Sequence, residues 1–316
     1  MLTPSSLACL RRVATVNLTA GCAHGCVYCY TRGYSHYPGE GRVILYANTL
    51  TRLQKELARK RVKPPAVYFS PSSDPFQPVP EVLTLLYQVL DLLLSSGIRV
   101  AFLTKGAIPR EHMDLLCGHA QLVAAQIGLT STDEPVLRVF EPYAAPAGIR
   151  LQQMGQLCRQ GIPAAVRLDP ILPGVTDDAR SLRRLFRAAA EQGVRSAAAS
   201  VLFLRPVVLS TLRRRLSPAM MDRLMGAFGA PERIAIRGES GSAMAMPAEA
   251  RRAILHRARS IAAEFGIAVK ICACKNPDLD SSDCGIAGDW PTPPTSSQQR
   301  SLFDSAGRNG SSAEAD

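Results

Sequence analysis

Short apolar runs alternate with segments of helical periodicity along most of this chain. Six of the runs are too short for a helix, and several are rich in valine and isoleucine, which is typical of buried strands. They cover residues 13–19, 66–70, 98–104, 122–130, 162–169 and 196–204. We therefore predict six β-strands.

Amphipathic helices are predicted between and after these strands. One helical face carries Leu83, Leu86, Leu90, Leu93 and Leu94. Another carries Leu182, Leu185, Phe186 and Ala189 behind a cap at Thr176 or Asp177. Strict alternation of strand and helix implies parallel strands with right-handed crossovers. The fold class is therefore α/β, either a barrel or an open doubly wound sheet.

The pattern divides the 316 residues into four parts. Residues 1–12 form an N-terminal segment, 13–210 the α/β core, and 211–290 a helical extension with a cysteine-containing loop. Residues 291–316 are rich in serine, proline and glycine, and we expect a disordered tail because they cannot bury enough apolar surface. With 47% hydrophobic residues, the rest can bury a substantial core.

Neither secretion nor membrane insertion is indicated. Residues 1–12 lack an apolar core of useful length, and no run approaches the roughly eighteen apolar residues of a membrane helix. We expect a soluble, cytoplasmic protein with no membrane partner, whose nine cysteines are reduced.

The charge is strongly basic. There are 37 lysines and arginines against 26 acidic residues, a net charge of +11, and short arginine runs occur at 183–184, 213–215 and 251–252. A basic surface favours a polyanionic partner such as nucleic acid. The alternative is an ordinary solvated face, because Arg183 and Arg251 lie on predicted helices whose opposite side is apolar.

Three cysteines within eight residues carry the most specific chemistry. Cys22, Cys26 and Cys29 follow the first predicted strand, and Gly21 and Gly25 beside them supply the freedom that a tight loop needs. A cubane cluster held by protein alone takes four thiolates, so three leave one iron open to a small molecule. The motif predicts an iron–sulfur cluster with an open iron.

Two other interpretations of this loop remain open. Zinc accepts mixed sulfur and nitrogen ligands, so His24 or His36 can complete a zinc site with the three thiolates. Zinc sites of this kind usually show paired C-x-x-C units, which this loop does not have. The other alternative is a purely structural cluster.

The pattern C-x-x-x-C-x-aromatic-C, with Tyr28 as the aromatic residue, resembles that of the radical S-adenosylmethionine (SAM) superfamily. The resemblance implies a [4Fe–4S] cluster whose open iron chelates the amine and carboxylate of SAM, with Tyr28 near the adenine. It implies one-electron cleavage of SAM, hydrogen abstraction from a substrate, and an electron donor such as flavodoxin or ferredoxin. It also implies a partial, six-stranded (βα)6 TIM-type barrel, with the site at the C-terminal edge of the strands.

Polar residues at the strand ends fit a SAM site of this kind. Ser72, Ser73 and Asp74 follow the second strand and suit the methionyl amine, while Lys105 after the third suits the carboxylate. Alternatively, the serines and Asp74 form a turn that leads into a helix, and Lys105 is an ordinary solvated surface lysine.

Two further strand ends carry candidate residues for the SAM site. Thr130 and Ser131 follow the fourth strand and can bond the ribose, or cap the next turn. Arg167 and Asp169 on the fifth strand share a face because side chains alternate, which places a charged pair in the barrel mouth. Arg167 is a candidate ligand contact, and an ion pair with Asp169 is the alternative.

Four stretches make the resemblance more specific: residues 21–30, 73–78, 103–105 and 170–174. They are similar to the spore photoproduct lyase-like (DNA repair photolyase-like) branch, which implies a nucleic-acid base as substrate. A peptide or small metabolite is the alternative within the superfamily, and a non-catalytic iron–sulfur or zinc protein is the alternative outside it. No catalytic residue is assigned: the lyase returns hydrogen from a cysteine, but Cys117 and Cys158 are expected to be helical core residues.

A second cysteine trio lies near the other end of the chain. Cys272, Cys274 and Cys284 stand among asparagine, aspartate, proline and glycine, so we expect a loop, where idle exposed thiols are unusual. Thiolates select iron–sulfur clusters, and the trio predicts an auxiliary cluster with its own open iron. A zinc site, or thiols that line the substrate pocket and donate hydrogen, are the alternatives.

Overall fold

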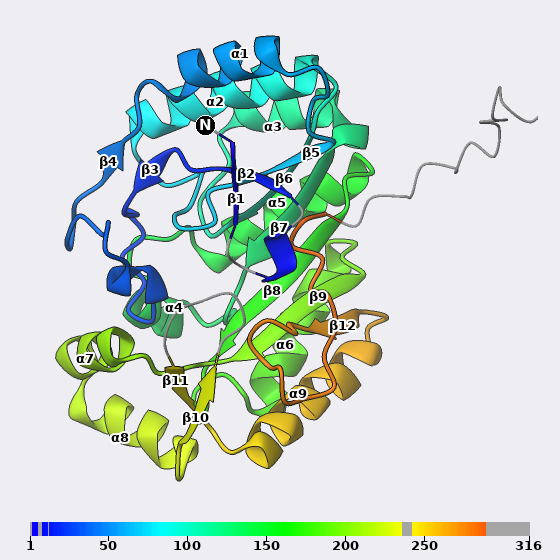
Figure 1. Ribbon diagram of the computed structural model, residues 1–316. Helices are drawn as coiled ribbons and strands as arrows, with labels where there is room; N and C mark the ends of the chain where they lie inside the picture. The colour runs from blue at the N-terminus through cyan, green and yellow to red at the C-terminus, as the bar shows by residue number, and fades with distance from the viewer. Residues whose placement is uncertain (1, 6–7, 12, 236–241, 289–316) are drawn as a thin grey trace, which may run out of the picture.

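The computed structural model describes residues 2–5, 8–11, 13–235 and 242–288. Its centre is a sheet of parallel strands with one antiparallel strand at the edge (Figure 1). From that edge the order is β1 (Thr3–Pro4, antiparallel), β2 (Ala14–Val16), β5 (Ala66–Phe69), β6 (Arg99–Thr104), β7 (Val123–Gly128), β8 (Ala164–Ile171), β9 (Ser196–Val201) and β12 (Ala268–Ile271). The predicted tail at 291–316 lies outside the described residues.

All six predicted strands are present in this sheet, and the partial TIM-type barrel is confirmed. The sheet also contains β12, which pairs in parallel with β9 from Ala268↔Ser196 to Ile271↔Ala199. We did not predict β12 because it is only four residues long and three of them are partly or fully exposed. The expected C-terminal extension therefore adds a strand to the core sheet.

Helices connect the parallel strands, as the alternation predicted. They are α1 (Thr49–Arg59), α2 (Pro80–Ser95), α3 (Arg110–Gly118), α4 (Glu134–Phe140), α5 (Ala147–Arg159), α6 (Ala179–Glu191), α7 (Pro206–Arg215), α8 (Pro218–Phe228) and α9 (Ala248–Ala263). Three 3-10 turns, η1 (Ala8–Leu10), η2 (Tyr30–Gly33) and η3 (Ala120–Leu122), and two small ribbons, β3 (Thr19–Ala20) with β4 (Ile44–Leu45) and β10 (Glu232–Ala235) with β11 (Ser242–Ala245), complete the fold. In the described residues, no helix is both long and apolar enough to span a bilayer.

The cap predicted for α6 is wrong by one to two residues. Asp178 is the cap, and its carboxylate accepts a hydrogen bond of 3.0 Å from the backbone N–H of Ser181. Thr176 is instead buried, where its hydroxyl accepts from the backbone N–H of Leu172. Asp178 has the extended backbone that a cap requires, and three acceptable caps in a row cannot be separated by pattern alone.

The two faces of the sheet are built differently. Large side chains such as Val67, Phe69 and Phe102 pack under the helices in the main core. Tyr68, Ala101, Ala124 and Ala198 alternate with them and belong to a separate buried cluster. That inner face is lined largely by alanine, and the blue N-terminal segment and the orange C-terminal loop both lie over it (Figure 1).

Candidate active site

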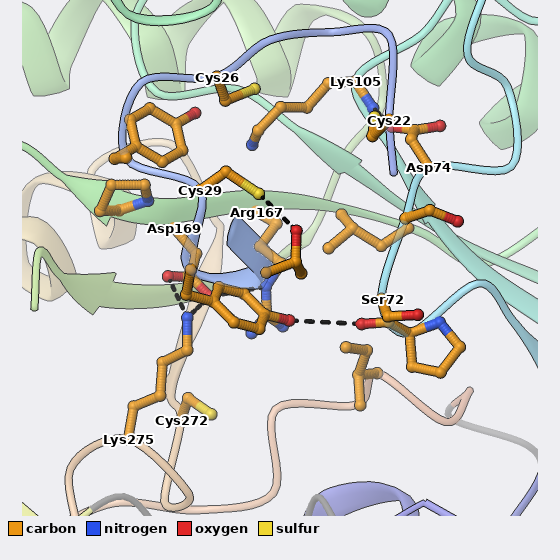
Figure 2. A pocket seen from close by; sticks show the side chains of 18 of the residues that line it. Cys22, Cys26, Cys29, Ser72, Asp74, Lys105, Arg167, Asp169, Cys272 and Lys275 are labelled. Carbon is orange, nitrogen blue, oxygen red and sulfur yellow. Dashed lines mark hydrogen bonds and ion pairs between the residues drawn. The ribbon is translucent and has the colours of Figure 1, made fainter. Parts of the chain in front are cut away.

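The first cysteine loop begins where ribbon strand β3 ends. Gly21 takes a φ of +81° and Gly25 a φ of +64°, a region that disfavours side chains. A Cβ on Gly21 would lie 2.3 Å from the carbonyl oxygen of Arg42, so only glycine fits there. The two glycines let the chain curl, and Cys22, Cys26 and Cys29 all line one cavity (Figure 2).

The donor set of this loop fits the predicted open-iron cluster. The three cysteines are half-buried, and burial is the main cause that raises the pKa of Cys22 and of Cys26. Three thiols from one loop, facing a shared cavity, are what a cluster with one iron free for a small molecule needs.

The histidines of the zinc alternative have other neighbours. His24 Nε2 lies 3.1 Å from Asp74 Oδ2 and its Nδ1 lies 3.2 Å from the carbonyl oxygen of Tyr143. The ring of His36 packs on Tyr34, with 5.4 Å between ring centroids. Among the described residues, no three His, Cys, Asp or Glu side chains are placed to hold a single metal ion.

A buried carboxylate that the sequence analysis missed anchors the cysteine loop. The side chain of Glu141, just after α4, is fully buried and accepts hydrogen bonds from the Tyr28 hydroxyl, from Thr130 Oγ1 at 3.0 Å and from Arg150 Nη1. Lys105 Nζ lies 3.7 Å away. Burial alone would raise the pKa of Glu141, but the charges of Lys105 and Arg150 hold it at about 2. The carboxylate is therefore ionised and joins the loop to two cations.

The predicted residues after β5 all line the cavity, and each also holds a neighbouring segment. Ser72 Oγ donates to Asn17 Oδ1 at 2.8 Å, and Ser73 Oγ lies 3.0 Å from Thr19 Oγ1. Asp74 accepts from Thr104 Oγ1 and from the backbone N–H of Lys105, both at 2.7 Å.

Ser70 is a cavity residue that the prediction passed over. It is a non-glycine residue with a positive φ, +51°, and its buried Oγ has no hydrogen-bond partner in the described part of the chain. Backbone strain and an unsatisfied buried hydroxyl are concentrated at functional sites.

Of the other predicted SAM contacts, Tyr28, Lys105 and Arg167 line the cavity. Thr130 and Ser131 do not occur among the described residues that line it. Thr130 donates to Glu141, and Ser131 Oγ accepts from the backbone N–H of Asp133 at 3.0 Å, next to the start of α4. Both hydroxyls are used within the fold.

The far wall of the cavity carries a charged group of three side chains. Arg167 Nη2 lies 2.9 Å from Asp169 Oδ2, which is the ion pair of our alternative interpretation, and Lys275 Nζ lies 2.7 Å from the same carboxylate (Figure 2). Burial would raise the pKa of Asp169, but Lys275 and Arg167 lower it to about 2. Lys275 also lies 5.7 Å from the ring centroid of Tyr30. The sequence analysis missed Lys275, whose one signal was its place beside Cys274.

The second cysteine trio reaches the same cavity. Cys272 and Cys274 line it, and Cys284 is buried beside them in the inner-face cluster. Cys9, from η1, lines the cavity too and belongs to that cluster. The cysteines expected in the core, Cys117 on α3 and Cys158 on α5, are helical and half-buried against the main core.

Several arginines of the basic runs are paired with carboxylates or buried, so they offer less unpaired surface charge than the sequence suggests. Arg183 forms an exposed ion pair with Glu264 at 2.7 Å, and Arg214 and Arg215 approach Glu40 at 3.1 and 3.3 Å. Arg251 is fully buried and is not a surface cation. It donates to the backbone oxygen of Met246 and to the carboxylate of Asp278. The arginine run at 251–252 thus contributes one surface charge fewer than expected.

Comparison with proteins of known sequence gives two kinds of relative. A radical SAM isomerase of Pseudomonas phage M6, named an Nα-GlyT isomerase, is 29% identical over 216 residues, which are 67% of this chain and 42% of that protein. An uncharacterised protein of Mycobacterium tuberculosis is 28% identical over 200 residues, 60% of this chain and 59% of that protein. The chain thus spans less than two thirds of the length of either relative.

Solved structures of spore photoproduct lyase have the same fold. One variant of the lyase superposes with a TM-score of 0.63 at 15% identity, over 85% of this chain and 78% of that one. Another, with bound SAM and dinucleoside spore photoproduct, gives 0.60 at 16% identity over 81% and 75%. The family model of the radical SAM superfamily matches residues 16–186, more than half of the sequence. With its cysteine loop at the mouth of a partial barrel, the chain belongs to the radical SAM superfamily.

Proposed function

We propose that this chain is a radical SAM enzyme that acts on a nucleic-acid base. The observation that carries the proposal is the single cavity lined by Cys22, Cys26 and Cys29 on one side and by aromatic and cationic side chains on the other. When bound, the [4Fe–4S] cluster and SAM supply a one-electron cleavage that leads to hydrogen abstraction from the substrate.

The chain's own residues would hold SAM beside the cysteine loop. Lys105 is half-buried, lines the cavity and suits the methionyl carboxylate as a point charge. The loop after β5 offers acceptors for the methionyl amine, and the unsatisfied hydroxyl of Ser70 faces the same space. Tyr28 is held in place by Glu141 and supplies an apolar ring for the adenine. Thr130 and Ser131 are not part of this proposal, because both hydroxyls bond within the fold.

The other side of the cavity suits a planar base next to a negative backbone. Tyr30, Tyr68 and Phe203 line it, and bases stack on such rings. Arg167 and Lys275 add positive charge, and the chain as a whole carries +11. The fold likeness to a lyase with a bound dinucleoside supports a base over a peptide or small metabolite, which remains the second option.

The first experiment tests the reaction class. Reconstituted protein is reduced anaerobically with dithionite or flavodoxin and incubated with SAM, and 5′-deoxyadenosine is measured. We expect slow SAM cleavage that is lost in Cys26→Ala and retained in Cys117→Ala, a matched cysteine outside the cavity. No cleavage by the wild type, or equal cleavage by Cys26→Ala, would contradict the proposal.

The second experiment tests the substrate class. DNA oligonucleotides deuterated on the bases are compared with deuterated peptides and nucleosides, and deuterium in 5′-deoxyadenosine is measured by mass spectrometry. We expect transfer from the DNA, together with DNA binding that weakens as salt rises. Transfer from peptides alone would assign the chain to the second option, and salt-independent binding would refute a phosphate-tracking surface.

A further inference from the structure

Four cysteines, not three, meet on the inner face of the sheet. Cys272, Cys274 and Cys284 follow β12, and the backbone N–H of Cys9 in η1 donates to Cys274 Sγ at 3.2 Å. Cys272, Cys274 and Cys284 belong to one buried cluster, and Cys9 packs against it. Residues 265 positions apart in the chain are thus brought to one point.

The site is buried and built over small side chains. Cys272, Cys274 and Cys284 are 2%, 7% and 2% exposed, in an apolar cluster with Leu10 and Ile286. The strand residues of this cluster are Tyr68, Ala101, Ala124 and Ala198, and the three alanines take up less space above the sheet than larger side chains would.

The loop that presents the trio is held by its own scaffold. The side-chain amide of Asn276 donates to the backbone oxygen of Cys272 at 3.1 Å, and the backbone N–H of Ser282 donates to the oxygen of Ile271 at 2.9 Å. Buried Arg251 donates to Asn276 Oδ1 at 3.3 Å and to Asp278 Oδ1 at 3.1 Å. These bonds fix the loop with its thiols turned inward.

A buried cation stands beside the thiols. Arg167 Nη1 donates to Gln126 Oε1 at 2.9 Å, and Gln126 Nε2 donates to the backbone oxygen of Cys284 at 2.8 Å. Through Gln126, Arg167 is joined to the loop that carries Cys284 as well as to Asp169.

We propose that Cys9, Cys272, Cys274 and Cys284 ligate a second [4Fe–4S] cluster in which every iron is held by a thiolate. Thiolates are the ligands that iron–sulfur clusters take, and a cubane held by protein alone takes four of them. This replaces the open-iron auxiliary cluster expected from three cysteines, because Cys9 fills the fourth position.

The position of the second cluster follows from the same residues. Cys9, Cys272 and Cys274 line the cavity that Cys22, Cys26 and Cys29 also line, so the two clusters would face one substrate space. With no free iron, the second cluster would not bind substrate directly. The proposal requires no SAM chemistry, and it can hold even where the proposed function fails.

The test counts metal in a chain that has lost the first site. In a triple variant, Cys22→Ala, Cys26→Ala and Cys29→Ala, anaerobic reconstitution should give about four irons and four sulfides per chain, against about eight of each in the wild type. The reduced triple variant should show an electron paramagnetic resonance signal of a [4Fe–4S] cluster that does not change on addition of SAM. Either result is independent of enzymatic activity.

The ligand set is then tested in the triple-variant background. Adding Cys284→Ala should abolish the remaining iron, and adding Cys9→Ala or Cys9→Ser should lower it by at least half or change its spectrum. Adding Cys158→Ala, a cysteine outside the group, should leave both unchanged. Circular dichroism identifies any variant that fails to fold, and Cys9→Ser keeps the size of the side chain.

Three results would overturn the proposal. The first is that the triple variant binds less than about one iron per chain. The second is that it binds one zinc in place of iron. The third is that both Cys9 variants keep four irons and an unchanged spectrum, which would exclude Cys9 as a ligand. Loss of SAM cleavage alone bears on the proposed function and not on this site.

Discussion

Glu141 ties the first cysteine loop to the barrel, and removing its charge should destabilise the fold strongly. Its carboxylate and the guanidinium of Arg150 are both fully buried and bonded to each other. In Glu141→Ala, Arg150 keeps its bonds to the backbone oxygens of Ala145 and Gly128 but loses its counter-charge. Breaking a buried ion pair on one side typically costs about 3–5 kcal/mol, because the other charge stays buried and uncompensated.

That cost is large enough to measure by thermal unfolding. In a chain of this size it corresponds to a fall in Tm of roughly 5–8 °C. The assay uses apo-protein, so that loss of a cluster does not contribute. Replacing both partners, as Glu141→Gln with Arg150→Met, should recover part of the loss because no lone charge remains.

A matched control is the exposed pair of Arg183 with Glu264, whose side chains are 43% and 44% exposed. Glu264→Ala should leave Tm nearly unchanged, because solvent screens exposed pairs. If Glu141→Ala lowered Tm no more than Glu264→Ala does, the hydrogen bonds and ion pairs of Glu141 would not hold the cysteine loop. The statement that Glu141 holds Tyr28 in place would then also be wrong.

Three further predictions concern single positions. Gly21→Ala should lower Tm and cluster loading far more than Gly41→Ala, because both have a positive φ but only at Gly21 would a Cβ meet a backbone oxygen, at 2.3 Å. The carboxyl of Asp169 has a pKa of about 2, so the stability that it contributes is present above pH ~4 and is lost as the pH falls through about 2. Urea unfolding of the wild type between pH 2 and 6 should therefore show roughly 2–3 kcal/mol more loss of unfolding free energy on acidification than unfolding of Asp169→Asn. Asp178→Ala should cost about 1 kcal/mol in urea unfolding through loss of the α6 cap.

Each of these has a clear contrary result. Equal losses in Gly21→Ala and Gly41→Ala would mean that the close contact relaxes without cost. An unchanged acid profile in Asp169→Asn would mean that the charged group on the far wall does not lower that pKa. An unchanged free energy of unfolding in Asp178→Ala would mean that Thr176 or Asp177, and not Asp178, caps α6.

The core of the fold and its first site could be predicted because their signals are local. The strands from β2 to β9 in the parallel sheet lie in short runs rich in apolar residues, and the cysteine loop lies within eight residues. The hydroxyls of Thr130 and Ser131 show the limit: a strand end can place a side chain near the cavity or inside a turn, and only the following chain decides.

The rest depends on contacts between distant segments. Glu141 lies in a stretch with no motif, and its role comes from burial beside Arg150 and Tyr28, which no pattern records. β12 is short and mostly partly or fully exposed, and it becomes a strand because it pairs with the edge of β9. Cys9 stood alone in the sequence, and its one signal was that a trio of cysteines elsewhere lacked a fourth ligand.

The 265-residue separation between Cys9 and Cys274 also sets an order of assembly. Chains emerge from the ribosome N-terminal part first, and domains fold as their segments become available. The first cysteine loop and its partner Glu141 are complete once about half of the chain has been made, whereas the inner-face group must wait for Cys284. Until then Cys9 is a lone thiol, open to oxidation or to a wrong partner. We therefore expect the two centres to mature in sequence, the later one closing over the inner face of a sheet that already exists.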